Sequence, residues 1–213
     1  PVTRYDYQDG AWRVYDDHGH LIAAAPVLIL AAGTGALDLI PPDILPIVKA
    51  RGQVSLLPAE AGSAPHVVVC RMGYVSPAVE GWRCAGATFA VNDDDTALRA
   101  ADHAENLAKL EGMLPGYTAG LHAGALHGRV GFRPASPDRL PMVGAVPVFE
   151  ALEQARPLLQ IPRQPGLYVA SGFGARGLVW SALLAENLAS QIHGDPLPLE
   201  QDLQDAIDPA RFL

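Results

Sequence analysis

The stretch that most constrains this fold runs from Gly166 to Gly194 and reads GLYVASGFGARGLVWSALLAENLASQIHG. Its apolar run 167–170 predicts a buried strand, and the segment from about 178 to 192 predicts an apolar helix. The glycines between them match the letters of the dinucleotide-binding fingerprint G-x-G-x-x-G. A helix that begins in such a turn presents backbone N–H groups and the positive end of its dipole, so it suits an electron-rich ligand group.

The fingerprint does not stand in the context of a Rossmann pyrophosphate loop. Such a loop needs a second strand after the helix, with an acidic residue about 20 positions beyond the glycines. Here the helix is followed by GDPLPLE at 194–200, whose two prolines disfavour a central strand. We therefore interpret the stretch as a closing strand and helix.

The first part of the chain predicts a β-meander over residues 1–30, with a turn at 16–20. The continuous apolar run 25–33 predicts a strand buried on both faces, as in a parallel sheet. Gly33, at its carboxyl end, permits close approach of a ligand. A plain turn from strand to loop is the alternative interpretation of that glycine.

The middle of the chain follows a proline-rich connector at 41–46 and has a different pattern. Four segments alternate as in an antiparallel sheet, namely 51–57, 66–70, 73–77 and 82–91. Residues 93–96 supply N-cap candidates for a helix that ends near Leu114. We expect its buried face to hold Leu98, Ala101, Ala104, Leu107, Ala108 and Leu110, and expect His103 to occupy a solvated or edge position. This block predicts a subdomain inserted into the first.

The remaining segments carry weaker signals. Residues 129–144, RVGFRPASPDRLPMVG, are crowded with Arg, Pro and Gly, and Arg129 is a candidate to brace the loop around Asp138. Residues 148–165 predict a surface loop. The tail after Gly194 looks acidic and irregular.

Composition narrows the class of protein. The 213 residues are 49% hydrophobic and 18% charged, which is typical of a globular chain, and no stretch is long and apolar enough to cross a membrane. The net charge of −8 disfavours a general nucleic-acid surface. Cys70 and Cys84 fit no metal spacing, so we assign no metal ligand. They could face each other across a hairpin, but we favour buried free thiols in a reducing, cytoplasmic setting. The chain opens on Pro1 and its first methionine is Met72, so we expect a piece of a longer protein, with no signal peptide at its start.

Five stretches together carry a family resemblance, and they occur in family order. They are RGQVS at 51–55, GYVSP at 73–77, GAT at 86–88, RVGFR at 129–133 with DRLPMVG at 138–144, and the glycine turn 172–177 with its helix. The chain resembles the carboxy-terminal part of a flavoprotein of the D-amino-acid oxidase and glycine oxidase class. Within that class it is most similar to the oxidoreductase half of bifunctional bacterial enzymes that mature the wobble uridine of certain tRNAs.

The resemblance implies a mixed α/β fold, in which an incomplete Rossmann-like FAD-binding domain is interleaved with an antiparallel substrate domain. Residues 1–45 and 129–213 would form the FAD-binding part, with the closing strand and helix at 166–193, and residues 46–128 the substrate part. The family's amino-terminal βαβ unit is absent.

The resemblance also implies roles for individual residues. The closing helix would point at the pyrimidine edge of the flavin, where reduction places negative charge. The implied cofactor residues are Gly33, Arg51, Ser171, Gly172, Gly174, Arg176 and Gly177. Arg133 would bind the substrate carboxylate through its planar fork, beside the hydroxyl of Tyr74. A surface ion pair for Arg133, a core position for Tyr74 and plain helix–strand packing for the glycines are the alternatives.

The implied reaction uses these parts. A carboxymethylaminomethyl group on uridine is an N-substituted glycine, and its oxidation by FAD would release glyoxylate and leave the aminomethyl base on the tRNA. A methyltransferase half, outside this chain, would then use S-adenosylmethionine. Two alternatives stay open: an oxidase of glycine, sarcosine or D-amino acids, and a non-catalytic piece that cannot hold FAD alone.

Overall fold

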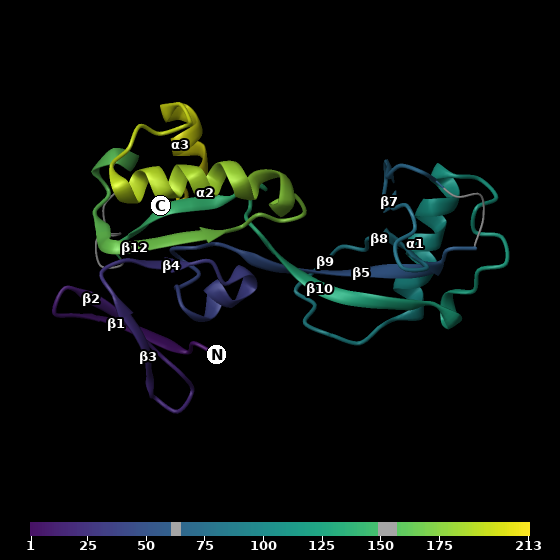
Figure 1. Ribbon diagram of the computed structural model, residues 1–213, viewed down its shortest axis with the longest axis horizontal. Helices are drawn as coiled ribbons and strands as arrows, with labels where there is room; N and C mark the ends of the chain where they lie inside the picture. The colour runs from purple at the N-terminus through teal and green to yellow at the C-terminus, as the bar shows by residue number, and fades with distance from the viewer. Residues whose placement is uncertain (61–64, 149–156) are drawn as a thin grey trace. The chain divides into compact units, whose positions relative to one another are not determined.

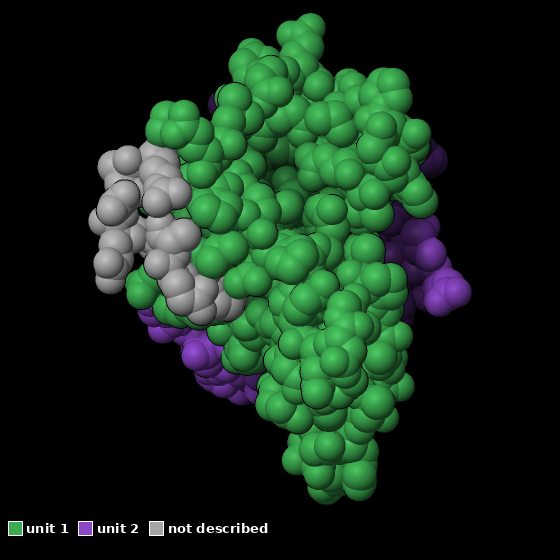
Figure 2. Space-filling model, turned by 90° about the vertical axis from the view of Figure 1, so that its left-hand side faces the viewer, with its two compact units in different colours: residues 1–48, 133–213 green, residues 49–132 purple. Residues whose placement is uncertain are grey.

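The protein divides into two compact units, seen in a computed structural model that describes residues 1–60, 65–148 and 157–213 (Figures 1 and 2). Unit 1 comprises Pro1–Val48 and Arg133–Leu213, and unit 2 comprises Lys49–Phe132. The predicted mixed α/β class is confirmed. The assignment of flavin and substrate binding to separate parts of the chain stays a prediction.

Unit 1 contains two three-stranded sheets. The first is the predicted meander, with β1 (Arg4–Gln8), β2 (Ala11–Tyr15) and β3 (Leu21–Ala25) in antiparallel order. The second has the order β11 (Met142–Pro147), β12 (Arg163–Ser171) and β4 (Leu28–Leu30), in which β12 is antiparallel to β11 and parallel to β4. The sheet therefore joins segments that lie almost 140 residues apart in the sequence.

Strand β12 separates two apolar cores because successive side chains of a strand point to opposite faces. Leu167 and Val169 belong to one core, while Tyr168 and Ala170 pack against the other. The first core also holds Trp12, Leu30, Ala36, Ile40, Ile44, Leu45, Ile47, Met142 and Val146. Several of these come from the 3₁₀ turn Gly33–Asp38 and from the connector 41–46, so the connector is packed within unit 1.

Helix α2 (Gly177–His193) contributes Leu184 and Leu188 to the second core, where they pack with Val143 of β11. The predicted closing strand and helix are thus confirmed. Gly194 ends α2 in the left-handed conformation at φ 73°, where glycine carries no steric penalty. The expectation of an irregular tail is wrong, because α3 (Gln201–Ile207) follows and buries Ile207 in the same core.

The expectation of a strand buried on both faces at 25–33 is also wrong. Strand β4 covers only three residues, and its Ile29 is 43% exposed. Leu30 is buried in the first core, whereas Ile29 lies on the opposite face, at the edge of the sheet. No other described strand pairs with that edge.

Unit 2 is built on an antiparallel sheet around β5 (Val48–Pro58), as predicted. The strand order is β10 (His127–Ala135), β5, β8 (Trp82–Gly86), β7 (Tyr74–Val75) and β6 (Val69–Cys70), and β9 (Ala90–Val91) also pairs with β5. Strand β10 begins in unit 2 and ends in unit 1. Short 3₁₀ turns lie at Ala123–Ala125 in unit 2 and at Leu158–Gln160 in unit 1. The predicted loop 148–165 falls partly on residues 149–156, outside the described residues.

Helix α1 (Ala100–Met113) begins later than predicted, and no side chain of residues 93–96 caps it. Arg99 holds the N-cap position and pairs with Asp93 and Asp95 instead. The cap contact comes from β5, where the Gln53 amide accepts from the Arg99 backbone N–H and donates to its carbonyl, both at 2.9 Å. The carboxylates of Asp93 and Asp95 therefore bind the Arg99 side chain and do not cap the helix.

The buried face of α1 is only partly the predicted one. Leu110 is buried and Leu107 packs against the same core, as predicted. Leu98, Ala101, Ala104 and Ala108 are exposed, and His103 and Asn106 are buried instead. His103 is only 3% exposed, so its predicted solvation is wrong. The reason is that β5 presents Gln53 and Ser55 to the helix, and polar side chains satisfy them.

Candidate functional site

The glycine turn of residues 172–177 lies where two parallel strands end. Strands β4 and β12 pair in register, and both run towards this edge of the sheet. The Ser171 hydroxyl donates to the Gly33 carbonyl oxygen at 3.0 Å, which ties the two strand ends together. The structure therefore brings together the residues predicted to bind the cofactor in unit 1, namely Gly33, Ser171, Gly172, Gly174, Arg176 and Gly177. Ligands of open α/β sheets bind at such an edge.

Three of these glycines are required by the backbone. Gly33, Gly172 and Gly174 have φ of 59°, 75° and 55°, a region in which other residues are strained. No heavy atom lies within 4 Å of an ideal Cβ on Gly174, so its surroundings are open. A Cβ on Gly177 would meet Phe173 at 3.6 Å, an ordinary contact, so nothing in the structure demands glycine there.

Strand β10, which contains Arg133, is hydrogen-bonded to the glycine turn 172–177. The Gly174 backbone N–H donates to the Pro134 carbonyl oxygen at 2.8 Å, and Ala135 forms a β-bridge with Phe173. Arg133 therefore lies one residue from the hydrogen bond that holds the glycine turn. The predicted substrate arginine and the predicted cofactor turn belong to one local structure.

The first turn of α2 is open. Arg176 stands at its N-cap position, and no side chain of the described residues makes a capping hydrogen bond there. Leu178 is 99% exposed and Val179 81% exposed. Because the first N–H groups of a helix have no partner within the helix, this terminus is suited to an electron-rich group.

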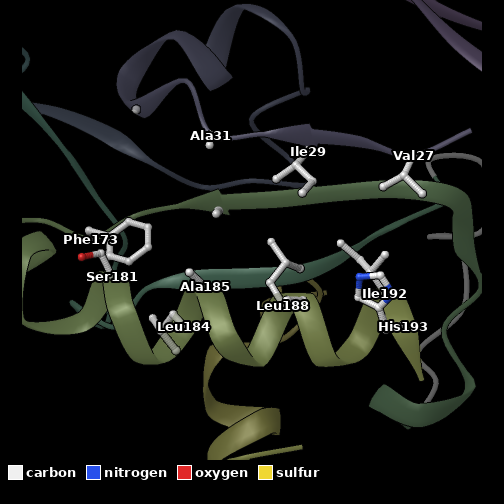
Figure 3. Close-up of a pocket in the computed structure, with 13 residues that line it drawn as sticks. Val27, Ile29, Ala31, Phe173, Ser181, Leu184, Ala185, Leu188, Ile192 and His193 are labelled. Atoms are coloured by element: carbon white, nitrogen blue, oxygen red, sulfur yellow. The ribbon is translucent and has the colours of Figure 1, made fainter. Parts of the chain in front are cut away.

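An apolar groove of about 670 Å³ begins beside this turn and follows α2 (Figure 3). Val27, Ile29 and Ala31 form one wall, and Leu188 and Ile192 of α2 form the other. Ser181 and His193 are its only side chains with polar atoms among the described lining residues. Such a lining does not match the phosphates of a dinucleotide, but it matches apolar side chains of another protein segment.

The two remaining predicted site residues lie in unit 2. Arg51 is 1% exposed and donates to the backbone carbonyls of Asp95 and Ala97 at 2.6 and 2.7 Å, and to the Asp102 carboxylate at 2.5 Å. These contacts hold the first turn of α1 and the segment before it, and a cofactor role for Arg51 stays a prediction. The Tyr74 hydroxyl lies 3.4 Å from the Cys84 sulfur, and its substrate role also stays a prediction.

The loop after Arg133 contains an ion pair that the sequence did not reveal. Arg211 donates through Nε and Nη2 to the two carboxylate oxygens of Asp138, at 2.8 and 2.9 Å. The brace expected from Arg129 is therefore supplied by Arg211. The turn-forming pattern Ser136–Asp138 is a visible signal, but nothing local points to a partner 73 residues away.

Three further observations concern the described residues. Cys70 and Cys84 are free thiols, but the expectation that both are buried is wrong, because Cys70 is exposed and Cys84 only partly buried. No group of three or more His, Cys, Asp or Glu side chains in the described part is placed to hold a metal ion. No helix over the described ranges has the length and hydropathy needed to cross a membrane.

Comparison with known proteins points to one family. The sequence pattern described as FAD dependent oxidoreductase matches residues 1–191. The chain is 67% identical, over 96% of its length, to the tRNA 5-methylaminomethyl-2-thiouridine biosynthesis bifunctional protein MnmC of Azoarcus sp. strain BH72. It is 60% identical, over its full length, to the protein of the same name from Aromatoleum aromaticum. The chain spans about a third of the length of these relatives.

Solved structures show the same fold. Iminodiacetate oxidase from Chelativorans sp. BNC1 matches 96% of this chain with a TM-score of 0.73 and 26% identity, and the match covers 51% of that protein. Glycine oxidase from Geobacillus kaustophilus matches 99% of this chain, and 52% of its own, with a TM-score of 0.73 and 18% identity. By its sequence pattern and its fold, this chain belongs to the FAD-dependent oxidoreductase family.

Proposed function

We propose that this chain is part of an FAD-dependent oxidoreductase that acts on a modified wobble uridine of tRNA, within a longer polypeptide that we call the parent protein. Its substrate would be 5-carboxymethylaminomethyl-(2-thio)uridine, and its products 5-aminomethyl-(2-thio)uridine and glyoxylate. The 67% identity to a tRNA-modification protein supports the substrate. The main structural support is the hydrogen bond from the Gly174 backbone N–H to the Pro134 carbonyl, which joins the glycine turn to the strand that contains Arg133.

The residues present fit one part of FAD. The open, uncapped start of α2 and the unobstructed Gly174 suit the electron-rich edge of a flavin ring. Ser171, Gly172, Gly174, Arg176 and Gly33 would line that approach. The remaining parts of FAD need phosphate-binding groups, which we propose come from the rest of the parent protein.

The chemistry divides between cofactor and protein. When bound, FAD supplies the acceptor for the two electrons and two protons that leave the C–N unit of the substrate. Water then cleaves the resulting C=N bond, so that the amine stays on the base and the two-carbon fragment leaves as glyoxylate. Arg133 holds the carboxylate in one orientation through two parallel bonds, which positions the reacting C–H bond.

Tyr74 is a separate proposal for unit 2, as a hydroxyl that donates to a substrate carboxylate. For the parent protein we propose a cytoplasmic location and a methyltransferase half that uses S-adenosylmethionine on the new amine. The bifunctional name of the relatives supports that second half.

A second candidate function is the oxidation of a small amino acid. The 26% identity to iminodiacetate oxidase favours it, because iminodiacetate also carries a carboxymethyl group on nitrogen. Glycine, sarcosine and D-amino acids are further substrates of this type. A third possibility is that this chain is a packing unit that holds no FAD by itself.

One experiment separates the three. The purified parent protein is examined for a flavin absorbance spectrum and then incubated with tRNA that carries the carboxymethylaminomethyl group. Glyoxylate release and an aminomethyl base, detected by mass spectrometry, support the tRNA reaction. Hydrogen peroxide release from glycine or sarcosine, with unchanged tRNA, would replace it by the second candidate. For the chain alone, a colourless protein supports the third possibility.

We also propose that the apolar groove is covered by another part of the parent protein, consisting of a strand and an apolar helix. The groove borders the edge of β4, with which no described strand pairs. A parallel strand added there would complete the hydrogen bonds of β4, and a helix beside it would bury Ile29. The length of the relatives, about three times that of this chain, leaves room for such a segment.

A further inference from the structure

The loop that joins β10 to β11, residues 136–141, is held by the C-terminal segment. Arg211 contacts Asp138 with two hydrogen bonds and donates from Nη2 to the Leu140 carbonyl at 3.0 Å. The Arg211 side chain is 8% exposed and the Asp138 side chain 33% exposed. A bidentate, partly buried pair of this kind sets orientation as well as distance.

Asp138 also shapes the loop from inside. Its Oδ1 accepts from the Leu140 backbone N–H and from the Ser136 hydroxyl, both at 3.0 Å. The Ser136 hydroxyl also lies 2.6 Å from the Leu140 carbonyl oxygen. Hydrogen bonds from Arg211 lower the pKa of Asp138 to about 2, so the carboxylate is charged at every working pH of an enzyme.

Both ends of this loop touch the glycine turn. At the first end, Pro134 and Ala135 bond to Gly174 and Phe173. At the second end, Gly172 packs so closely on Met142 that an added Cβ would lie 3.3 Å from its backbone nitrogen. A displacement of the loop would therefore also displace the glycine turn and Arg133, which lies one residue before Pro134.

We propose that Arg211 is a positioning residue, which fixes the relative placement of Arg133 and the glycine turn through Asp138. This inference rests on the proposed function, because it assumes that Arg133 holds a substrate carboxylate beside a flavin. Without Arg211 the loop keeps its sequence and its turn, but its anchor to the C-terminal segment is lost. The substrate carboxylate held by Arg133 would then vary more in its position relative to the flavin edge at the glycine turn. This wider variation would slow the reaction.

The chain contains a matched control pair. Arg163 donates to the two carboxylate oxygens of Asp208 at 2.8 and 2.9 Å, and its side chain is 24% exposed. This pair also anchors the C-terminal segment. Arg163 also donates to the carbonyls of Ala145 and Leu158, and the Asp208 carbonyl accepts from Nη1 of Arg211 at 3.1 Å. Unlike Arg211, Arg163 makes no hydrogen bond to the loop 136–141 within the described part of the chain. Loss of either pair should loosen the C-terminal segment, but only loss of Arg211 should disturb the site.

The test compares Arg211→Ala, Arg211→Lys and Arg163→Ala in the parent protein. For each variant, flavin content, the unfolding midpoint, and kcat and KM on the modified tRNA are measured. We expect Arg211→Ala to lower kcat/KM about tenfold with flavin retained, because small misplacements in a site cost factors of this order. Arg211→Lys should recover part of the loss, since it restores a charge without the bidentate geometry. Arg163→Ala should leave kcat/KM within about twofold at a similar loss of stability.

A second readout does not depend on turnover. Acetate is titrated as a carboxylate probe, because it has no amine that the flavin could oxidise, and the change in flavin absorbance reports its binding beside the ring. Arg211→Ala should weaken this response and Arg163→Ala should not. Equal effects of the two substitutions on kcat/KM and on the probe would overturn the positioning role and leave the proposed function intact. Unchanged turnover and probe binding in an Arg133→Ala variant would instead overturn the proposed function, and this inference with it.

Should Arg211→Ala fail to fold, Asp138→Asn provides the same test. The amide keeps the size of the side chain and an acceptor oxygen for Leu140, but it removes the charge and one acceptor for Arg211. It should lower kcat/KM and the probe response in the same direction. Full activity of a folded Asp138→Asn variant would count against the inference.

Discussion

The Ser171 hydroxyl donates to the carbonyl oxygen of Gly33 at 3.0 Å, across 138 residues of sequence. This bond joins the ends of the two parallel strands at the edge where the glycine turn begins. Ser171 is fully buried, so loss of its hydroxyl would remove a hydrogen-bond donor from the Gly33 carbonyl oxygen. The predicted cofactor residues of unit 1 therefore form a connected structure.

Replacement of Arg133 is the most direct test of the substrate site. We expect Arg133→Ala in the parent protein to abolish most turnover while flavin stays bound, because the carboxylate loses its two parallel bonds. Arg133→Lys should recover little, since an ammonium group cannot form the bidentate contact. The measurement is kcat/KM on the modified tRNA, with the flavin absorbance spectrum as the control. Wild-type turnover of Arg133→Ala would refute the assignment.

The groove allows a test with a close control on the same helix. Ala189 lines the groove and Ala182 does not, and both are exposed on α2. We expect Ala189→Glu to lower the flavin content of the parent protein, because a charge would be buried under the covering segment. Ala182→Glu should leave the flavin content unchanged. Equal flavin contents in the two variants would show that nothing covers the groove.

Gly128 offers a test of packing in unit 2. An ideal Cβ there would lie 2.4 Å from the Val54 carbonyl oxygen and 2.7 Å from the His103 ring, contacts that real side chains do not make. Gly128→Ala should therefore destabilise the protein by about 1–3 kcal/mol, measured as the free energy of unfolding in urea. Gly124→Ala is the control, because no heavy atom lies within 4 Å of its Cβ position. A Gly128→Ala variant as stable as this control would contradict the packing described.

His103 should make stability depend on pH. The Ser55 hydroxyl accepts from the amide of Asn106 and lies 2.7 Å from Nδ1 of His103. The ring is buried at this position, which disfavours its charged form. Burial lowers the pKa of His103 below its usual 6.5, against a smaller opposing effect of the Asp102 charge.

The sign follows from proton binding. The unfolded chain takes up the His103 proton at a higher pH than the folded chain, so folding is favoured above about pH 6.5 and loses stability as the pH falls through the folded pKa. We expect His103→Gln to be less stable at pH 8 but to lose less stability on acidification to pH 5. Urea unfolding at the two pH values measures both. Identical pH dependence in the two proteins would rule out the neutral, buried state of His103.

The sequence anticipated some elements of both units and missed others. The meander and the closing strand and helix follow from alternation, apolar periodicity and glycine placement, which are local signals. The short, half-exposed β4 was not anticipated, because the same apolar run suits a strand with or without neighbours on both sides. Likewise, apolar spacing identified Leu107 and Leu110 of α1 but missed His103 and Asn106, which are buried because β5 presents polar groups to them.

The candidate site shows the same division. The sequence by itself determined where glycine is needed, at Gly33, Gly172 and Gly174, and where a helix could begin. Tertiary structure alone decided that the Pro134 carbonyl holds this turn, that Arg211 pairs with Asp138, and that Gln53 caps α1. The physical reason is that backbone conformation depends on neighbouring residues, whereas buried hydrogen bonds and ion pairs are satisfied by whichever groups the fold brings within about 3 Å, however distant in sequence.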